Sequence, residues 1–359
     1  MNRTDLSPSD PAAPRPSQLI RTLIVDDSAF VRKAVREMLS RSPYIDVVGA
    51  ARDGEEALEL AAELKPDIIT CDLNMPRLDG VGFVRRQMAI APVPILILSS
   101  SPEDAGQVLE ALNAGAVDFI QKPTALATDQ LLDVREQLVA KVKAAARAPV
   151  ANLNHAGVGQ LVATAKNLSL KVDLVVLGIS TGGPQALRFL LPELPADFPV
   201  PIAIVLHMPV GYTAPFAEKL DELCQIDVAE ASEGAVLRPG LALIAQAGRH
   251  LEIHRNRNGA SVAHLTLHPL DRLHRPSVDV LFQSAANAHG KRVLGIVMTG
   301  MGDDGKQGAA WIKAQGGTIL TEAESSCIIY GMPRSVVEAG LSDASIPLAK
   351  MAQAIVEHL

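Results

Sequence analysis

Short apolar runs alternate with amphipathic segments over roughly the first 140 residues. Leu19–Val25 and the segments IDVVGA, DIITCD, ILILSS and VDFI have the length and apolar content of buried strands. After the first run, one helical face collects the apolar positions Val31, Ala34, Val35, Met38 and Leu39. Five strand–helix repeats with apolar strands predict a parallel sheet covered by helices on both faces, the flavodoxin-like (βα)5 arrangement.

The same alternation begins again at Val172. Strands are expected in VDLVVLGIS, VPIAIVLH, GLALIAQ, KRVLGIVMTG and GGTIL, and helices at Val278–Ala288 and Lys306–Ala314. The segment HLEIHRNRNGASVAHLTLH alternates apolar and polar residues around Asn258-Gly259, which is typical of a β-hairpin. The pattern predicts a second doubly wound, Rossmann-like α/β domain that carries an antiparallel hairpin.

These patterns divide the chain into four parts. Residues 1–18 are rich in Pro, Ser and Asp and predict a disordered tail, and residues 19–143 form the first domain. Residues 144–171 are rich in Ala and Asn without a strand signal, so we expect a linker with some helical character. Residues 172–359 form the second domain.

Composition limits the partners of the protein. A formal net charge of −7 argues against nucleic acid as a partner, and the three cysteines show no metal-like or disulfide-like spacing. The chain lacks an apolar run long enough to span a membrane, and its N-terminus lacks the apolar core of a signal peptide. A cytoplasmic protein without membrane insertion is expected.

Charged residues follow the strands of the first domain where those strands end. Asp26 and Asp27 follow the first strand, Asp72 ends the third, Ser99 ends the fourth, and Lys122 lies just past the fifth. The carboxyl ends of parallel strands share one edge of the sheet, where ligands bind. Three carboxylates there favour a Mg²⁺ ion, and a carboxylate beside Mg²⁺ and a lysine can attack a phosphoryl group. Helix capping explains each acid alone, but it does not explain the whole set.

The segments LIVDDSAFVR, TCDLNMPRLDG, PILILSS and DFIQKP resemble the motifs of response-regulator receiver domains. The resemblance implies that Asp72 accepts a phosphoryl group and that Phe119 is the aromatic switch residue. It also implies Mg²⁺ ligands at Asp26, Asp27, Asp72 and the backbone carbonyl of Asn74, and phosphoryl contacts from Ser99 and Lys122.

A serine stands in a glycine-rich turn at the start of the second domain, in VVLGISTGGPQAL. Gly178 to Gly182 match the pattern G-x-S-x-G, which presents a nucleophilic serine between a strand and a helix. Such turns also bind phosphate or permit close packing, although the turn matches neither common nucleotide-binding pattern. Taken alone, the turn leaves Ser180 open between these roles.

Two further strand ends favour the nucleophile. His207 ends an apolar strand and is the best base among nine histidines, and the turn VLGIVMTGMGDDG carries Asp303 and Asp304. A nucleophile, a base and an acid at neighbouring strand ends have the geometry of a catalytic triad. Backbone N–H groups near Thr181 and Met301 are candidates for an oxyanion hole. The order Ser, His, acid differs from that of the common α/β-hydrolases and disfavours that fold.

The other histidines receive structural roles. We expect His289 to cap the end of a helix. A metal site is not expected among the histidines around the hairpin, because no Asp, Glu or Cys accompanies them at ligand spacing; they are His250, His254, His264, His268 and His274.

The segments GISTGGPQAL, LHMP, HRPSVDVLF, MTGMGDDG and YGMPR resemble the chemotaxis protein-glutamate methylesterases, the CheB family. That resemblance implies Ser180 as nucleophile, His207 as base and Asp304 as acid, with Asp303 at a variable position. It implies hydrolysis of glutamate methyl esters, and deamidation of glutamines, on methyl-accepting chemotaxis receptors. It further implies the histidine kinase CheA as phosphodonor, Mg²⁺ in the receiver and no cofactor for the esterase.

Two other functions fit the residues. One is a receiver-controlled hydrolase of a small soluble ester, and the other is a receiver with a non-catalytic output such as a transcription factor. Because the ligand-binding edges of both domains face outward from their sheets, we also expect the unphosphorylated receiver to cover Ser180 as a lid.

Overall fold

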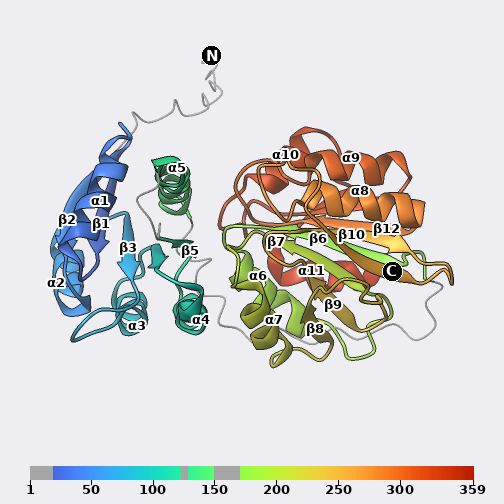
Figure 1. Cartoon of the computed structure of the whole chain (residues 1–359), viewed down its shortest axis with the longest axis horizontal. Coiled ribbons are helices and arrows are strands. Elements are labelled where there is room, and N and C mark those ends of the chain that lie inside the picture. The colour runs from blue at the N-terminus through green and yellow to red at the C-terminus, as the bar shows by residue number, and fades with distance from the viewer. Residues whose placement is uncertain (1–18, 123–127, 149–169) are drawn as a thin grey trace, which may run out of the picture.

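The computed structural model describes residues 19–122, 128–148 and 170–359, except that side chains are described only from residue 134 in the second range. These residues form two α/β domains that lie side by side, the first coloured blue to green and the second green to red in Figure 1. The expected tail and most of the expected linker fall outside the described residues.

The first domain is built on a five-stranded parallel sheet in the order β2-β1-β3-β4-β5, as the alternating pattern predicts. Its strands are β1 (Ile20–Val25), β2 (Ile45–Ala51), β3 (Ile68–Asp72), β4 (Ile95–Ser99) and β5 (Asp118–Gln121). Its helices are α1 (Ala29–Ser40), α2 (Gly54–Leu64), α3 (Gly80–Ile90), α4 (Ala105–Asn113) and α5 (Thr128–Ala145).

Helix α1 illustrates how the sequence determines these elements. The Ser28 hydroxyl accepts a hydrogen bond from the Val31 amide (3.4 Å) and caps the first turn. Val35 and Leu39 are buried on the apolar face expected from their spacing, and Val31 and Met38 pack beside them. The helix therefore covers the sheet with the face that its periodicity predicts.

The second domain contains a seven-stranded parallel sheet in the order β14-β13-β12-β6-β7-β9-β8. Its strands are β6 (Leu174–Ile179), β7 (Ile202–Leu206), β8 (Asp227–Glu230), β9 (Leu241–Ile244), β12 (Val293–Val297), β13 (Thr318–Glu322) and β14 (Ala344–Ile346). Its helices are α6 (Gly183–Leu190), α7 (Thr213–Asp221), α8 (Val278–His289), α9 (Lys306–Ala314), α10 (Met332–Glu338) and α11 (Leu348–His358). The sequence did not predict β8 and β14, which are short edge strands.

The predicted hairpin consists of β10 (His250–Arg255) and β11 (Ser261–Thr266), which pair antiparallel. Arg255 pairs with Ser261, so residues 256–260 form the turn, and Gly259 adopts a φ of +80°. That left-handed conformation favours glycine. The hairpin is confirmed, with a connection longer than the Asn258-Gly259 pair.

The two domains are in contact along one face of the receiver. Helix α4, strand β5 and helix α5 lie on the side of the first domain that faces the second (Figure 1). From α6, the Gln185 side-chain amide donates hydrogen bonds to the backbone carbonyls of Ala116 (2.6 Å) and Leu112 (3.3 Å).

Among the described helices, none has both the length and the apolar content needed to cross a membrane.

Candidate functional site

Ser180 lies immediately after β6, at the carboxyl edge of the second sheet. Its amide donates to the carbonyl of Thr299 (2.9 Å), and its carbonyl accepts from the amide of Gly183 (2.6 Å). Gly182 has a φ of +80°, which permits the sharp turn from β6 into α6. A Cβ atom at Gly300 would lie 2.8 Å from the Ser180 Cβ, so the backbone approaches the serine closely at this point. The backbone of Ser180 is therefore fixed by the start of α6 and by the segment of Thr299 and Gly300.

His207 follows β7, the strand next to β6. Its amide donates to the carbonyl of Ile179 (3.2 Å), the residue before Ser180. Its Nε2 lies 2.9 Å from the Asp304 carboxylate. Its Nδ1 is buried and has no hydrogen-bond partner among the described residues. Because a carboxylate only accepts hydrogen bonds, neutral His207 carries its proton on Nε2 and leaves a lone pair on Nδ1.

Asp304 is fixed at the N-terminus of α8. Its carboxylate accepts hydrogen bonds from the Ser277 hydroxyl (3.0 Å) and from the amides of Val278 (2.8 Å) and Asp279 (3.0 Å). Burial alone would raise the pKa of this carboxyl. The hydrogen bond to His207 and the amide donors outweigh burial, so the pKa falls to about 2. Asp304 is therefore ionised at neutral pH and lies, with its side chain 10% exposed, beside His207.

Asp279, in the first turn of α8, binds the N-terminus of α9 as Asp304 binds the N-terminus of α8. One of its carboxylate oxygens accepts from the amides of Gly305 (3.0 Å) and Gly308 (2.7 Å), at the start of α9. The turn that carries Asp304 is thus tied to α8 from both sides. By contrast, the side chain of Asp303 is 73% exposed and lies 3.7 Å from Lys306. The structure brings Asp304, and not Asp303, to His207.

A cavity of about 540 Å³ contains Ser180 and His207 and is walled by both domains. Thr181 and Met301, the candidates for the oxyanion hole, also line it. The receiver contributes side chains from β5, α5 and the residue after β5, namely Phe119, Ile120, Gln121, Lys122, Val134, Gln137 and Lys141. The candidate active site therefore faces the receiver.

Two histidines lie differently from our expectation. His289 ends its helix before Gly290, as expected, but its side chain contacts the Ser261 hydroxyl (2.9 Å) and Arg255 (3.1 Å) instead of the carbonyls of that helix. His274 lies in the cavity instead of beside the hairpin, and its ring stacks on that of His207, with centroids 4.2 Å apart and planes 22° apart. Sequence proximity to the hairpin misled the prediction, because the loop before α8 returns to the sheet edge.

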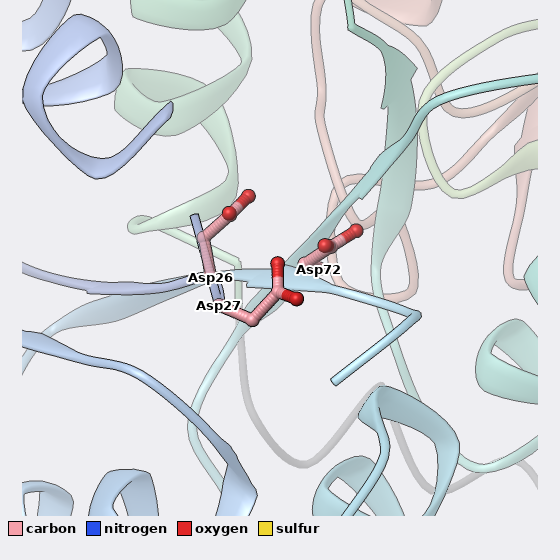
Figure 2. A group of neighbouring side chains, drawn as sticks. All are labelled: Asp26, Asp27 and Asp72. Carbon is pink, nitrogen blue, oxygen red and sulfur yellow. The ribbon is translucent and has the colours of Figure 1, made fainter. Parts of the chain in front are cut away.

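The three predicted carboxylates of the first domain meet at one edge of its sheet (Figure 2). Carboxylate oxygens of Asp26, Asp27 and Asp72 all lie within 4.8 Å of one another. Among the described residues, no other group of three or more His, Cys, Asp or Glu side chains lies close enough together to hold a metal ion. Asp26 is fully buried and Asp72 is 5% exposed, whereas Asp27 is exposed. Buried, clustered carboxylates need positive charge nearby.

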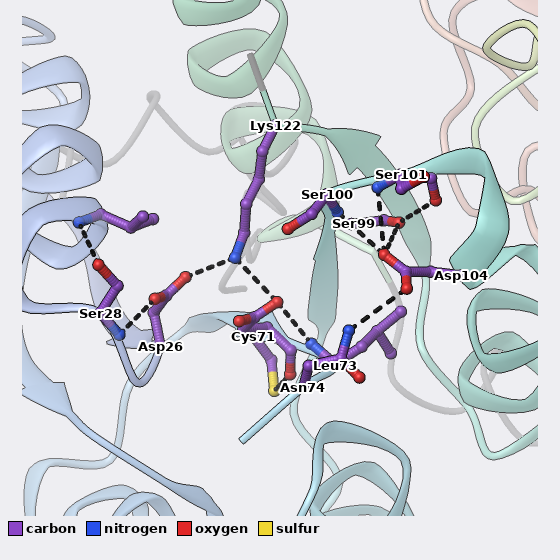
Figure 3. Close-up of polar contacts among 12 residues, drawn as sticks. Asp26, Ser28, Cys71, Leu73, Asn74, Ser99, Ser100, Ser101, Asp104 and Lys122 are labelled. Carbon is purple, nitrogen blue, oxygen red and sulfur yellow. Dashed lines mark hydrogen bonds and ion pairs between the residues drawn. The ribbon is translucent and has the colours of Figure 1, made fainter. Parts of the chain in front are cut away.

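Lys122 supplies part of that charge (Figure 3). Its Nζ lies 2.7 Å from Asp26 and 2.8 Å from Asp72. Burial lowers the pKa of Lys122, but the two carboxylates raise it more, so it ends above its usual value. Burial raises the pKa of Asp72, and Lys122 lowers it only in part. The single Lys122 ammonium contacts two of the three carboxylates, and the oxygen donors of the cluster are those that Mg²⁺ prefers.

Ser99 and Asn74, the other predicted residues of this site, both contact Asp104 (Figure 3). The Ser99 hydroxyl lies 3.2 Å from the Asp104 carboxylate, and the Asn74 side-chain amide donates to that carboxylate at 3.3 Å. The role of the Asn74 backbone carbonyl as a metal ligand stays a prediction. Ser99 is fully buried at the end of β4.

Tyr212, which the sequence did not indicate, links this site to the second domain. Its hydroxyl lies 2.9 Å from the Ser99 hydroxyl and donates to the Ser101 carbonyl at 2.8 Å. Its ring packs on Phe119, with centroids 4.7 Å apart, and both rings are fully buried. The serine and the aromatic residue predicted to sense phosphorylation therefore both contact one side chain of the other domain.

The fold and the acidic cluster define a response regulator, whose output domain brings His207 and Asp304 together at the sheet edge that carries Ser180. Comparison with protein families agrees: residues 22–134 match the response regulator receiver domain, and residues 175–355 match the CheB methylesterase domain. The chain belongs to the CheB methylesterase family, in its form with an N-terminal receiver domain.

Individual relatives are similar over nearly their whole length. A protein-glutamate methylesterase/protein-glutamine glutaminase of Myxococcus xanthus is 49% identical, covering 95% of this chain and 98% of that protein. Another of the same description, from Halalkalibacterium halodurans, is 41% identical over 94% of this chain and 98% of its own. The crystal structure of the Thermotoga maritima CheB methylesterase catalytic domain is 37% identical, with a TM-score of 0.51 over 52% of this chain and 99% of that one.

Proposed function

We propose that this chain is a phosphorylation-activated protein-glutamate methylesterase and protein-glutamine glutaminase with Ser180, His207 and Asp304 as its catalytic residues. The observation that carries the proposal is the His207–Asp304 pair, which leaves Nδ1 of His207 unbonded while the backbone of His207 is joined to Ile179, the residue before Ser180. This arrangement provides a nucleophile, a base and an acid that fixes the tautomer of the base.

The reaction follows from the state of His207. As the Ser180 oxygen attacks the carbonyl carbon of a glutamate methyl ester, His207 Nδ1 takes the serine proton. The ionised Asp304 stabilises the imidazolium that forms. His207 then gives the proton to the departing methoxide, and methanol leaves. Water hydrolyses the acyl-enzyme by the same proton transfers and restores glutamate, and with a glutamine substrate ammonia leaves instead of methanol.

Thr181 and Met301 are proposed to hold the oxyanion of each tetrahedral intermediate. Both line the cavity with Ser180, and Thr181 is 2% exposed. Backbone N–H groups that point at the developing negative charge contribute about 3–4 kcal/mol each in other serine hydrolases.

In the receiver, Asp72 is the proposed phospho-acceptor. Asp26, Asp27, Asp72 and the Asn74 carbonyl would hold Mg²⁺, which would neutralise charge on the transferring phosphoryl oxygens. Lys122 contacts Asp72 at 2.8 Å and Ser99 lies at the end of the neighbouring strand β4, so we expect both to contact the phosphoryl group. The histidine kinase CheA is the proposed phosphodonor.

The proposed substrates are glutamates on the cytoplasmic helices of methyl-accepting chemotaxis receptors. Two turns of such a helix occupy roughly 800–1200 Å³, given a diameter of about 10–12 Å. The cavity at Ser180 measures about 540 Å³ and has receiver side chains on one wall. Because receiver side chains form part of this wall, we expect movement of the receiver to open Ser180 to a receptor helix.

Phosphorylation is proposed to cause this movement. A phosphoryl group on Asp72 would attract the Ser99 hydroxyl, which now bonds to Tyr212 across the domain interface. Loss of that bond, together with a shift of Phe119, would weaken the docking of the receiver. In this proposal the phosphoryl group shifts an equilibrium between docked and undocked states, and both states already exist in the unphosphorylated protein.

Methanol release from methyl-labelled receptor membranes tests the catalytic assignment. We expect Ser180→Ala to abolish release and Asp304→Asn to lower kcat by about 10³–10⁴-fold, because the amide no longer fixes the tautomer of His207. Asp303→Asn is the matched control and should retain activity. Loss with Asp303→Asn but not with Asp304→Asn would overturn the choice of acid.

A second experiment tests the lid. Esterase rates of the full chain, with and without a phosphodonor, are compared with that of residues 150–359. We expect the isolated domain to exceed the unphosphorylated chain. If it is no faster, the receiver does not cover the active site.

A further inference from the structure

His274 is the one side chain in the cavity whose ring is stacked on the proposed base, and the proposed reaction does not use it. The two imidazole rings lie nearly parallel, 4.2 Å between centroids and 22° between planes. No hydrogen bond involves the His274 side chain within the described ranges, whereas His207 is bonded to Asp304. Its contact with the triad is therefore made through the ring face.

The loop that carries His274 is anchored on both sides of it. His250, which is fully buried, contacts the carbonyl of Pro269 through Nε2 (3.1 Å) and accepts from the Ser277 amide through Nδ1 (3.2 Å). The Ser277 hydroxyl also donates to Asp304 (3.0 Å). His250 and Ser277 thus tie the loop to the hairpin and to Asp304, so the backbone that carries His274 is held on both sides of this residue before substrate binds.

The stacked ring has two physical consequences for His207. It restricts rotation of the imidazole, which must keep Nε2 on Asp304 and Nδ1 toward Ser180 at the same time. It also covers one face of the ring, and an aromatic face attracts a cation when water is excluded. The imidazolium that forms as Ser180 loses its proton is such a cation.

His274 meets this role best as a neutral ring, because a second positive charge would oppose the imidazolium. Burial, together with the nearby His207 and Lys141, lowers the pKa of His274 to about 4, although Asp304 acts in the opposite direction. At neutral pH the ring of His274 is therefore uncharged.

We propose that His274 is a positioning residue of the esterase, whose stacked ring orients His207 and stabilises its protonated form during acylation. The proposal rests on the proposed function, since it assumes that His207 is the base. It assigns the work to the flat face of His274 and not to its nitrogens.

Replacement of the ring separates these roles. His274→Ala removes the stack, and His274→Phe keeps a flat face without nitrogens. In the phosphorylated full chain, with methyl-labelled receptor membranes, we expect His274→Ala to lower kcat by about 10- to 30-fold with little change in KM. We expect His274→Phe to stay within about threefold of wild type, and both variants to unfold near the wild-type temperature.

A probe that needs no receptor gives a second measurement. A fluorophosphonate labels an activated serine, so its labelling rate at Ser180 should fall in His274→Ala and recover in His274→Phe. His268→Ala is the matched control, because His268 is exposed on the same loop and the structure shows no side-chain contact for it among the described residues. It should label at the wild-type rate.

Each contrary outcome has a distinct meaning. Wild-type kcat and labelling in His274→Ala would overturn the proposal. Equal losses in His274→Phe and His274→Ala would also overturn it, since they would show that a ring nitrogen is needed. Ser180→Ala is measured in parallel: if it retains methanol release, the proposed function fails, whereas an inactive Ser180→Ala beside a fully active His274→Ala refutes only the role of His274.

Discussion

Tyr212→Phe should activate the esterase without phosphorylation. The substitution keeps the ring that packs on Phe119 and removes only the hydroxyl. That hydroxyl makes two hydrogen bonds across the domain interface, a buried one to the Ser99 hydroxyl (2.9 Å) and a partly buried one to the Ser101 carbonyl (2.8 Å). Nothing within the second domain bonds to the Tyr212 hydroxyl among the described contacts, so the loss falls on docking.

The magnitude follows from these two bonds. Each contributes about 0.5–1.5 kcal/mol net. Ser99 keeps two other partners at 3.2 Å, the Ser101 carbonyl and the Asp104 carboxylate, so it is not left unsatisfied. We therefore take a total loss of about 1–2 kcal/mol, which changes the ratio of docked to undocked chains by about 5- to 30-fold. The rate of the unphosphorylated chain should rise by a similar factor, up to the rate of the phosphorylated chain.

The assay is methanol release from methyl-labelled receptor membranes, with and without a small phosphodonor. Tyr44→Phe is the matched control, because Tyr44 is 52% exposed on the first domain and its hydroxyl makes no described bond to the second. A basal rate within twofold of wild type in Tyr212→Phe would refute the reasoning. An equal gain in the phosphorylated chain would also refute it, because the effect would then lie in catalysis and not in docking.

Three further predictions concern other groups. Asp72→Asn, or removal of Mg²⁺ by a chelator, should abolish activation by phosphodonor while leaving the basal rate unchanged, as measured by methanol release. Gly300→Ala places a Cβ 2.8 Å from the Ser180 Cβ and should lower kcat by about 10- to 100-fold, seen also as slower fluorophosphonate labelling. Burial raises the pKa of Glu193 to about 7 from 4.5, so the folded chain holds a proton that the unfolded chain loses. The protonated Glu193 contributes at most about 3 kcal/mol to the free energy of unfolding; this contribution is full below pH 4.5 and disappears by about pH 7. Between pH 5 and 8, the Tm of Glu193→Gln should therefore fall less than the Tm of the wild type.

Local pattern was enough to predict most of the two sheets. Strands buried on both faces are continuous apolar runs, and the turns after them carry the functional residues, so both are visible in sequence. The edge strands β8 and β14 were missed because they are not continuous apolar runs; in β8, Asp227 is exposed and Val228 is buried, and no residue of β14 is fully buried. Their pairing depends on the neighbouring strand more than on their own composition.

Contacts made by loops were not predictable in the same way. Tyr212 and His274 both lie outside strands, and their partners are distant in sequence: Ser99 for the first and His207 for the second. Periodicity carries no information about such pairs. The segment HRPSVDVLF did mark the second loop as part of the family pattern, but the role of its histidine becomes visible only when the loop is seen against the sheet edge.

The strand order explains both the order of the catalytic residues and the orientation of the imidazole. Strand β6 lies between β7 and β12, so Ser180 is central and its partners come from opposite sides. Strands β7 and β12 are therefore about 9–10 Å apart, and a His207 side chain must cross the end of β6 to reach Asp304. The distal nitrogen, Nε2, makes that long reach, and the proximal Nδ1 remains without a hydrogen-bond partner among the described residues, as the proposed proton transfer from Ser180 requires. The base comes from the strand that follows β6 in the chain and the acid from a later strand, so the order Ser, His, Asp is a consequence of this topology and separates it from the common hydrolase fold.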